Sequence, residues 1–359
     1  MSTPRVLAIG GLPRDMGRAH GRALGEQIRG YAAERVALAG SAAWTGHALP
    51  RAEVLALAES CMGEHEAYAP DLMDELAGIA ETTGLGVAEL IISNGFTDFI
   101  DLVYARGGSS GETAYVEDDC TAFIVPDSLS ADGRGFFGQT WDMHASSAPY
   151  VVLLHGQPVD APAFLAFSLA GCVGMIGMNN SGIAIGINNL LGAKGQVGVT
   201  WPFVVRKALQ QSDIEDALAC ITDARLVGAH NYQLFDRHGA GINVEAMPGH
   251  CAVSRCDAEA LVHSNHCLVA ETIARCRPRA AASQASSEAR LVRARALLAE
   301  DALTPEKLMD LTRDPVICVR GEPPLDMETC GAAIMQPASG RLWAVQGLPV
   351  DNSYAEYSL

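Results

Sequence analysis

The most constraining feature of this 359-residue sequence is a change of hydrophobic period at the glycine- and serine-rich segment 107–112. Before it, apolar residues recur at helical spacing in segments 14–39, 51–67, 70–83 and 87–105. After it come short apolar runs separated by Gly, Pro, Asp and Asn, which are typical of strands in antiparallel sheets. Helices followed by strands mixed with further helices predict an α+β fold built in layers.

The second part of the chain carries most of the expected strands. They are predicted at residues 120–125, 136–141, 151–154, 164–169, 183–187, 232–235, 241–245, 261–263, 331–335 and 342–345, the last two closing the chain. Further helices are predicted at 202–222, 285–300 and 305–312.

The charge balance narrows the classes of partner. The sequence has 42 acidic and 25 basic residues, for a net charge of −17. Because such a chain repels phosphate backbones and anionic lipid, we expect neither nucleic acid nor membrane as a partner. No secretion signal is recognised at the start, and no segment reaches the roughly 18 apolar residues that span a bilayer. We therefore expect a cytoplasmic protein.

Ten cysteines are scattered along the chain without a CxxC pair or zinc-finger spacing. In the cytoplasm they are expected to be reduced, and a small buried hydrophobe is the ordinary interpretation of each. No bound metal and no cofactor is predicted.

Cys120 differs from the other nine in its surroundings. Glu117, Asp118 and Asp119 precede it, and it begins an apolar strand. Carboxylates beside a thiol oppose formation of the thiolate, so a redox or zinc role is poorly served here. If the chain is cut just before Cys120, its own α-amine becomes a base with a pKa of about 7.7–8.0. Cys120 is therefore the candidate nucleophile.

Six landmarks in order resemble the acyl-coenzyme A:6-aminopenicillanic acid acyltransferase family of N-terminal nucleophile (Ntn) hydrolases, and more distantly the choloylglycine hydrolases. They are GLPRDMGRAHG at 11–21, APDL through GIAE at 69–81, DCT at 119–121, GQTWD at 138–142, GMNNSG through Asn188 at 177–188, and HSNH at 263–266. The chain departs from the family pattern at Asp119, where glycine is common, and in SNGFTD at 93–98.

The resemblance implies a four-layer αββα sandwich with two antiparallel sheets between helices. It also implies self-cleavage before Cys120, in which the thiol attacks the Asp119 carbonyl. Residues 1–119 would form a small helical fragment and residues 120–359 the Ntn core, together one structural domain.

The resemblance also assigns roles around Cys120. Asp142 would orient the α-amine, although a turn-forming Asp fits the same position. Gln139 stands where choloylglycine hydrolases carry an arginine and could only form hydrogen bonds, or serve as a plain sheet residue. Asn265 is the expected oxyanion donor, with a turn Asn as the alternative.

Further roles are more open at this point. Asn188 is a candidate for contact with the reacting carbonyl, and its neighbour Asn189 fits equally well. Arg290 resembles an arginine near the nucleophile of choloylglycine hydrolases, but also a solvated residue on a helix face. Thr121 is a candidate aid to self-cleavage or an ordinary strand residue.

His263 and His266 are three residues apart, a spacing that raises the question of a metal site. No third ligand is in sight, so packing or support of the active residues is preferred for both.

The predicted activity is amide hydrolysis of a small N-acyl amide through a thioester on Cys120. An acyltransferase that delivers the acyl group to an amine is the alternative on the same scaffold, and an uncleaved binding protein is the alternative from another class. The sequence leaves open the identity of the acyl group and of the amine. It also leaves open the oligomeric state, and a homo-oligomer is compatible with it.

Overall fold

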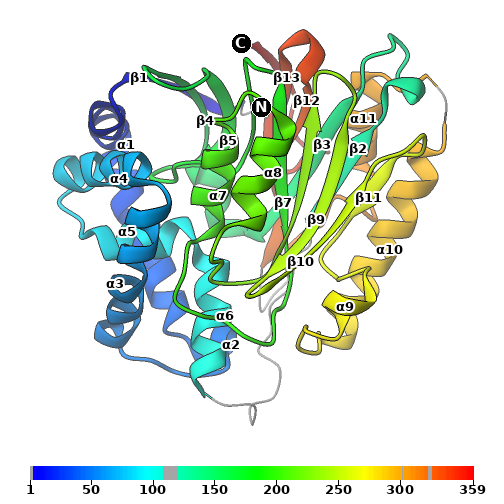
Figure 1. Ribbon diagram of the computed structural model, residues 1–359. Coiled ribbons are helices and arrows are strands. Elements are labelled where there is room, and N and C mark those ends of the chain that lie inside the picture. The colour runs from blue at the N-terminus through cyan, green and yellow to red at the C-terminus, as the bar shows by residue number, and fades with distance from the viewer. Residues whose placement is uncertain (1–2, 108–119, 301, 322–325) are drawn as a thin grey trace.

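The computed structural model describes residues 3–107, 120–300, 302–321 and 326–359. Two β-sheets pack face to face, and helices cover both outer faces (Figure 1). The layers therefore run helix, sheet, sheet, helix, which confirms the predicted α+β class and the four-layer αββα sandwich.

The larger sheet has the strand order β1-β4-β5-β6-β7-β8-β9-β10 within the described residues. Its strands are β1 (Arg5–Gly11), β4 (Val151–Pro158), β5 (Phe164–Leu169), β6 (Ile176–Asn179), β7 (Ile183–Asn189), β8 (His230–Asp236), β9 (Gly241–Met247) and β10 (His250–Arg255). β1 pairs parallel with β4, while the other neighbours are antiparallel. The expectation of two purely antiparallel sheets was therefore wrong at this edge.

The smaller sheet has the order β11-β2-β3-β12-β13-β14. Its strands are β2 (Thr121–Val125), β3 (Phe136–His144), β11 (Leu261–His263), β12 (Met327–Gln336), β13 (Arg341–Gln346) and β14 (Ala355–Ser358). The sequence missed β1, β6, β10 and β14, so the chain does not close on 342–345 as predicted. These four strands are edge strands or only four residues long, where hydrophobic alternation is weakest.

The N-terminal part is helical after β1. Its helices are α1 (Pro13–Ala39), α2 (Ala42–Thr45), α3 (Arg51–Tyr68), α4 (Pro70–Thr83), α5 (Val87–Asn94) and α6 (Phe96–Gly107). A single helix over 87–105 was wrong, because the chain breaks at Gly95. A Cβ there would lie 2.4 Å from the Thr200 side chain, so the break permits a close approach that only glycine allows.

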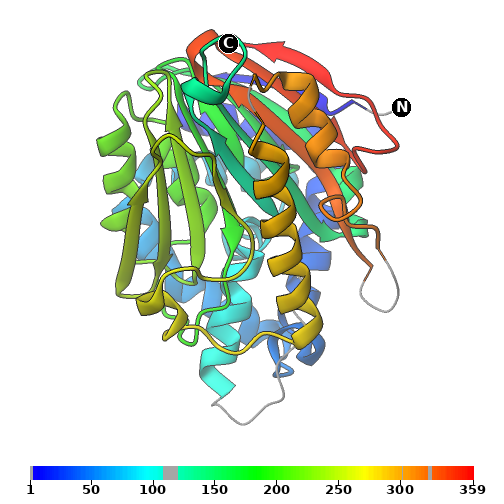
Figure 2. The same cartoon turned by 90° about the vertical axis from the view of Figure 1, so that its right-hand side faces the viewer.

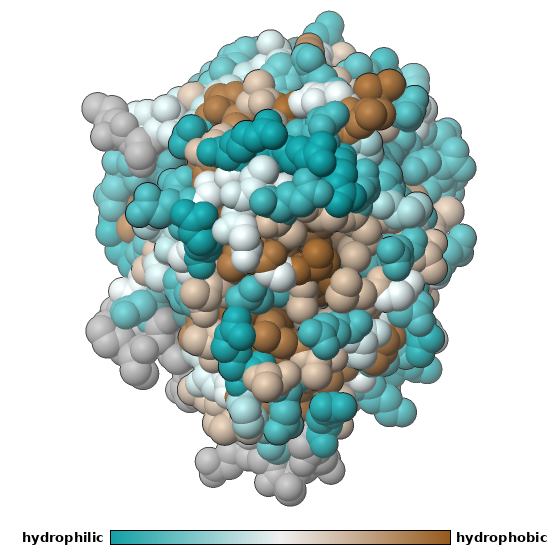
Figure 3. Space-filling model, turned by 90° about the vertical axis from the view of Figure 1, so that its left-hand side faces the viewer, coloured by the Kyte–Doolittle hydropathy of each residue, from teal (hydrophilic) through white to brown (hydrophobic). Residues whose placement is uncertain are grey.

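Glycines also explain two of the sequence landmarks. α1 and α4 cross where a Cβ on Gly17 would lie 1.8 Å from the Glu75 carbonyl oxygen, and a Cβ on Gly78 2.2 Å from that of Arg14. Figure 3 views the molecule from the side of these helices, where hydrophilic side chains gather in a band with small hydrophobic patches between them. Exposed ion pairs from Arg14 to Glu81 add little stability to this crossing.

The helices of the C-terminal part cover both sheets. They are α7 (Trp201–Ala208), α8 (Ile214–Thr222), α9 (Ala270–Ile273), α10 (Ala281–Leu298) and α11 (Pro305–Arg313), with short 3₁₀ turns at Asp127–Leu129, Ala145–Tyr150 and Pro337–Ser339. The predicted helix 202–222 is two helices, since the Asp213 side chain accepts from the Glu215 N–H and caps a new start. Figure 2 shows α10 and α11 lying over the smaller sheet.

Two large hydrophobic cores and one small cluster form among the described residues. One lies between the sheets and under the N-terminal helices, and it includes residues before and after Cys120. The other lies between the smaller sheet and helices α10 and α11. In the described part of the chain no single helix has the length and apolarity to cross a membrane; α4 and α5, bent by 116°, meet those criteria only as a pair.

Candidate active site

Cys120 comes immediately before β2, and its side chain is 3% exposed. Alternation along the strand fixes the direction of the side chain. Ala122 and Ile124 belong with Cys120 to the core between the sheets, whereas Phe123 packs in the core under α10. The sulfur of Cys120 therefore faces the space between the two sheets.

Asp142 lies on the neighbouring strand β3. Its backbone N–H donates to the Cys120 Sγ at 3.4 Å, and its carbonyl oxygen lies 3.7 Å from the same sulfur. The Asp142 side chain is fully buried. The structure thus brings the two residues together through the Asp142 backbone, and a bond from its carboxylate to the α-amine of Cys120 stays a prediction.

Arg290 joins Cys120 to Asn265. It projects from α10 and is fully buried, so the alternative of a solvated helix-face arginine is wrong. Nη1 donates to the Cys120 carbonyl oxygen at 2.7 Å and to the Thr121 Oγ1 at 3.1 Å. Nη2 donates to the Asn265 Oδ1 at 3.1 Å. One rigid guanidinium therefore sets the nucleophile and the candidate oxyanion donor relative to each other.

Asn265 follows β11, the strand that pairs with β2 through His263 and Ala122. Its backbone N–H donates to the Ser287 Oγ at 2.9 Å, which anchors the loop to α10. Its Nδ2 donates to the Asn189 carbonyl oxygen at 3.2 Å. Because an amide nitrogen carries two hydrogens, this bond leaves one for a substrate oxygen.

Asn188 and Asn189 lie at the end of β7 and face opposite sides of the sheet. A Cβ on Gly186 would meet the Gln139 side chain of the smaller sheet, so this face of β7 is directed to that sheet. Asn188 lies two residues after Gly186 on the same face and is therefore directed to the smaller sheet as well. Asn188 is fully buried, and neither its Nδ2 nor its Oδ1 has a hydrogen-bond partner among the described residues. Of the two, Asn188 has the side chain directed to the layer of Cys120.

Gln139 links the two sheets. Its Nε2 donates to the Ile187 carbonyl oxygen, and its Oε1 accepts from the Ile187 N–H at 3.0 Å. These two hydrogen bonds fix the end of β7 that carries Asn188. Gln139 therefore positions this strand, and it does not supply the positive charge that an arginine would bring.

Glu245 on β9 is a residue that the sequence interpretation missed. Its carboxylate accepts from His263 Nε2 at 2.9 Å, from the Leu268 N–H at 2.6 Å and from the Thr272 hydroxyl. Burial alone would raise the pKa of Glu245, but the hydrogen bond and charge of His263 with the other donors hold it below its usual value. The sequence did contain a signal for this residue, because a carboxylate within an apolar strand needs a partner when it is buried.

The two histidines of the HSNH motif have structural partners. The second ring nitrogen of His263 lies 2.7 Å from the Ser264 carbonyl oxygen, and His266 Nδ1 lies 2.7 Å from the Ser287 Oγ. Burial lowers the pKa of His266 to about 4, so the ring is neutral at pH 7. Across the described ranges, no group of three or more His, Cys, Asp or Glu is placed to hold a metal ion.

The divergent segment 93–98 ties the N-terminal helices to loops of the larger sheet. Asn94 Nδ2 donates to the Gly171 carbonyl oxygen at 2.8 Å, and Asp98 Oδ2 accepts from the Trp201 N–H at 2.9 Å. The segment therefore has a structural role in this chain. Asp119, the other departure, lies outside the described residues.

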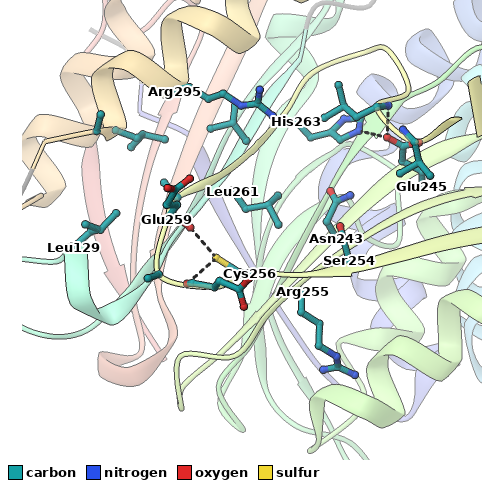
Figure 4. A pocket seen from close by; sticks show the side chains of 18 residues that line it. Leu129, Asn243, Glu245, Ser254, Arg255, Cys256, Glu259, Leu261, His263 and Arg295 are labelled. Carbon is teal, nitrogen blue, oxygen red and sulfur yellow. Dashed lines mark hydrogen bonds and ion pairs between the residues drawn. The ribbon is translucent and has the colours of Figure 1, made fainter.

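Two pockets border the constellation. One of about 470 Å³ begins at Asn265 and is lined by Leu191, Arg277 and Glu288 among others. A larger one of about 1020 Å³ lies beyond the bonded pair of Glu245 and His263, between β9–β10 and β11 (Figure 4). Of these two pockets, the smaller one touches the candidate oxyanion donor.

The sequence profile of the acyl-coenzyme A:6-aminopenicillanic acid acyl-transferase family matches residues 129–345, more than half of the chain. The chain belongs to this family. This match confirms the resemblance of the sequence landmarks to the acyl-transferase family.

One curated relative in the acyl-transferase family is the acyl-coenzyme A:6-aminopenicillanic-acid-acyltransferase 40 kDa form of Emericella nidulans. It is 25% identical over 207 residues, which cover 56% of this chain and 53% of the relative. The match thus spans about half the length of that protein.

Solved structures with related chain traces include a variant of conjugated bile acid hydrolase from Clostridium perfringens, at 13% identity and a TM-score of 0.47. It covers 67% of this chain and 97% of the other. Penicillin V acylase from Agrobacterium tumefaciens has 12% identity and a TM-score of 0.38, over 68% and 80% of the two chains. Because these identities and TM-scores are low, the roles of residues in this member of the acyl-transferase family rest on its own geometry.

Proposed function

We propose that this protein is an amidohydrolase that cleaves a small N-acyl amide through a thioester on Cys120. The observation that supports this most directly is the set of bonds made by Arg290. The buried guanidinium binds both the Cys120 carbonyl and the Asn265 side chain and so fixes their relative positions. Two groups that act on one substrate need such fixed positions.

The proposed base is the α-amine of Cys120, freed by self-cleavage. The Sγ attacks the Asp119 carbonyl carbon, the peptide C–N bond breaks, and water hydrolyses the resulting thioester. The released amine has an ordinary pKa of about 7.7–8.0, close to the optimum for proton transfer. Both ring nitrogens of His263 have partners, which favours the amine over this nearby histidine.

In the catalytic cycle the Sγ adds to the substrate carbonyl, and the proton passes through the α-amine to the leaving amine. The negative oxygen of the tetrahedral intermediate would accept hydrogen bonds from Asn265 Nδ2 and Asn188 Nδ2. One such donor is typically worth about 10²–10³ in rate. Water then adds to the thioester carbonyl carbon, the C–S bond breaks, and the acid leaves.

An acyltransferase is the second candidate, and the family match favours it. The relative from Emericella nidulans is named for acyl transfer to 6-aminopenicillanic acid. On the same scaffold, an amine in place of water would take the acyl group from Cys120. A reaction with water and an added amine in competition separates the two, because the acyl group ends as a free acid in hydrolysis and as a new amide in transfer.

The experiment that tests the proposal is thioester trapping. The purified protein is mixed with a panel of N-acyl amides, quenched in acid and examined by intact mass and peptide mapping. We expect an acyl adduct on Cys120 that hydroxylamine removes, and none in Cys120→Ala. Turnover with an acyl adduct on a different residue would refute the assignment, and lack of any adduct or turnover would favour the binding protein.

A further inference from the structure

The face of the larger sheet that meets the smaller sheet carries an unusual row of carboxamides. Asn188 on β7 pairs with Asn231 on β8, and Gln233 on β8 pairs with Asn243 on β9, so the four side chains share this face. Each is 5% exposed or less. Faces buried between two packed sheets are ordinarily apolar, so this polar row requires an explanation.

The row lacks sufficient partners within the protein. Asn231 Nδ2 donates to Asn243 Oδ1 at 2.6 Å. In the part of the chain that the structure describes, the Asn231 Oδ1, the Gln233 Oε1 and both polar atoms of Asn188 have no hydrogen-bond partner. An unpartnered buried polar atom costs about 1–3 kcal/mol, so four of them in one row call for polar ligands.

The smaller sheet has a small side chain, Ala122, between two of its contacts with the larger sheet. Ala122 pairs with Gln139 on one side and with His263 on the other. Gln139 is bound to Ile187 on the larger sheet, and His263 to Glu245. Between these two inter-sheet contacts Ala122 presents only a methyl group. Cys120, two residues earlier, faces the same layer.

The two ends of the row meet a pocket and the nucleophile. Asn243 and its cross-strand partner Ser254 line the pocket of about 1020 Å³, next to Glu245 and His263 (Figure 4). At the other end Asn188 shares the inter-sheet layer with Cys120. The row therefore runs from this pocket inward along the face that meets the layer of Cys120.

We propose that Asn188, Asn231, Gln233 and Asn243 hold a file of water molecules that supplies water for hydrolysis of the Cys120 thioester. Water can both donate and accept, as the orphan carbonyl oxygens and amide of the row require, and buried waters usually have two to four such partners. The row opens at Asn243 to the pocket of about 1020 Å³, whereas the pocket of about 470 Å³, which we take as the entrance for substrate, begins at Asn265. Substrate and water thus reach Cys120 from different sides.

The step supplied by the file balances without a further reactant. The water oxygen adds to the thioester carbonyl carbon, one proton passes to the Cys120 α-amine, and the C–S bond breaks. The amine returns the proton to the thiolate. This inference rests on the proposed thioester chemistry, and it makes the row the determinant of hydrolysis against transfer to an amine.

The test uses the substitutions Asn231→Leu and Gln233→Met, which put an apolar side chain of similar length at each position and remove the orphan oxygens. Acylation of Cys120 should be unchanged, while hydrolysis of the thioester slows about tenfold, the rate equivalent of a lost hydrogen bond of roughly 1.4 kcal/mol. Quenched intact mass should show the acyl-enzyme accumulating. With an added amine, the ratio of amide product to acid should rise by the same factor.

The matched control is Tyr232→Phe, which removes an orphan hydroxyl from the opposite face of the same strand. It should leave the product ratio unchanged. Wild-type hydrolysis rates in both row variants would overturn the proposal, as would an equal effect in the control. Failure of the wild type to form any thioester would instead refute the proposed function.

A high-resolution crystal structure gives a readout independent of turnover and of variant folding. Ordered waters bonded to the Asn188, Asn231 and Gln233 side chains are expected, and a dry row would overturn the proposal.

Discussion

Arg290→Lys is the substitution that most directly tests the link between the nucleophile and the oxyanion donor. The guanidinium donates to the Cys120 carbonyl, the Thr121 hydroxyl and the Asn265 side chain at 2.7–3.1 Å. An ammonium at the end of a flexible chain can retain one of these bonds in good geometry. Two lost bonds to a charged donor at about 1.5 kcal/mol each give roughly 3 kcal/mol, or about 10² in kcat if the loss falls on the transition state.

The assay compares kcat for an N-acyl amide with the free energy of unfolding in urea. Arg293→Lys is the matched control, because Arg293 lies about one turn further along α10 and its half-exposed side chain pairs with Asp314. We expect the control to turn over like the wild type. Wild-type kcat in a folded Arg290→Lys protein would refute the reasoning, and so would an equal loss in both variants.

Three further predictions concern support of the site and of the fold. Burial lowers the pKa of His65 to about 4, with Thr200 donating to its Nε2, so the unfolded chain binds the proton first on acidification. Stability from neutral His65 is therefore lost between about pH 6.5 and 4, and His65→Gln should remove up to about 3 kcal/mol of that pH dependence in urea titrations. Glu245→Gln should cost about 1–3 kcal/mol at pH 7 and lower kcat, since the native pKa of Glu245 is depressed and its carboxylate holds the loop after Asn265. The deficit should shrink as pH falls through that depressed pKa, where wild-type Glu245 is protonated as well. Asn188→Ala should reduce kcat by about 10²–10³ with little change in melting temperature. Asn189→Ala should leave kcat close to the wild-type value.

Each of the three has a contrary result. An unchanged pH slope in His65→Gln would show that another group carries the acid sensitivity. A pH-independent deficit in Glu245→Gln would mean that its charge is not what stabilises the loop. Equal losses at Asn188 and Asn189 would contradict the assignment by strand direction.

Local patterns predicted the α+β class, because they report helices and strands directly, whereas the four layers and the residues expected around Cys120 came from the resemblance of the landmarks. Helical periodicity identified segment 70–83 with the bounds of α4, and the apolar run at 164–169 matches β5. The break at Gly95 was not predictable in this way. It depends on how closely Thr200 approaches from a loop more than a hundred residues later.

The site shows the same division. Motifs supplied Asn265 and Arg290, but only the fold separates Asn188 from Asn189, since the choice depends on which face of β7 meets the smaller sheet. Glu245 and the row members Asn231, Gln233 and Asn243 escaped notice because no local motif contains them. Their partners come from different strands and loops, and single-strand patterns do not report such contacts.

The most direct test of the central claim is the mass of the purified chain. If Cys120 becomes an N-terminus, intact mass spectrometry should show two species that correspond to residues 1–119 and 120–359, and Edman degradation of the larger one should begin with Cys120. Cys120→Ala should remain one chain. An intact wild-type chain that nevertheless turns over an N-acyl amide would contradict the account, because Cys120 would then act without the base proposed for it.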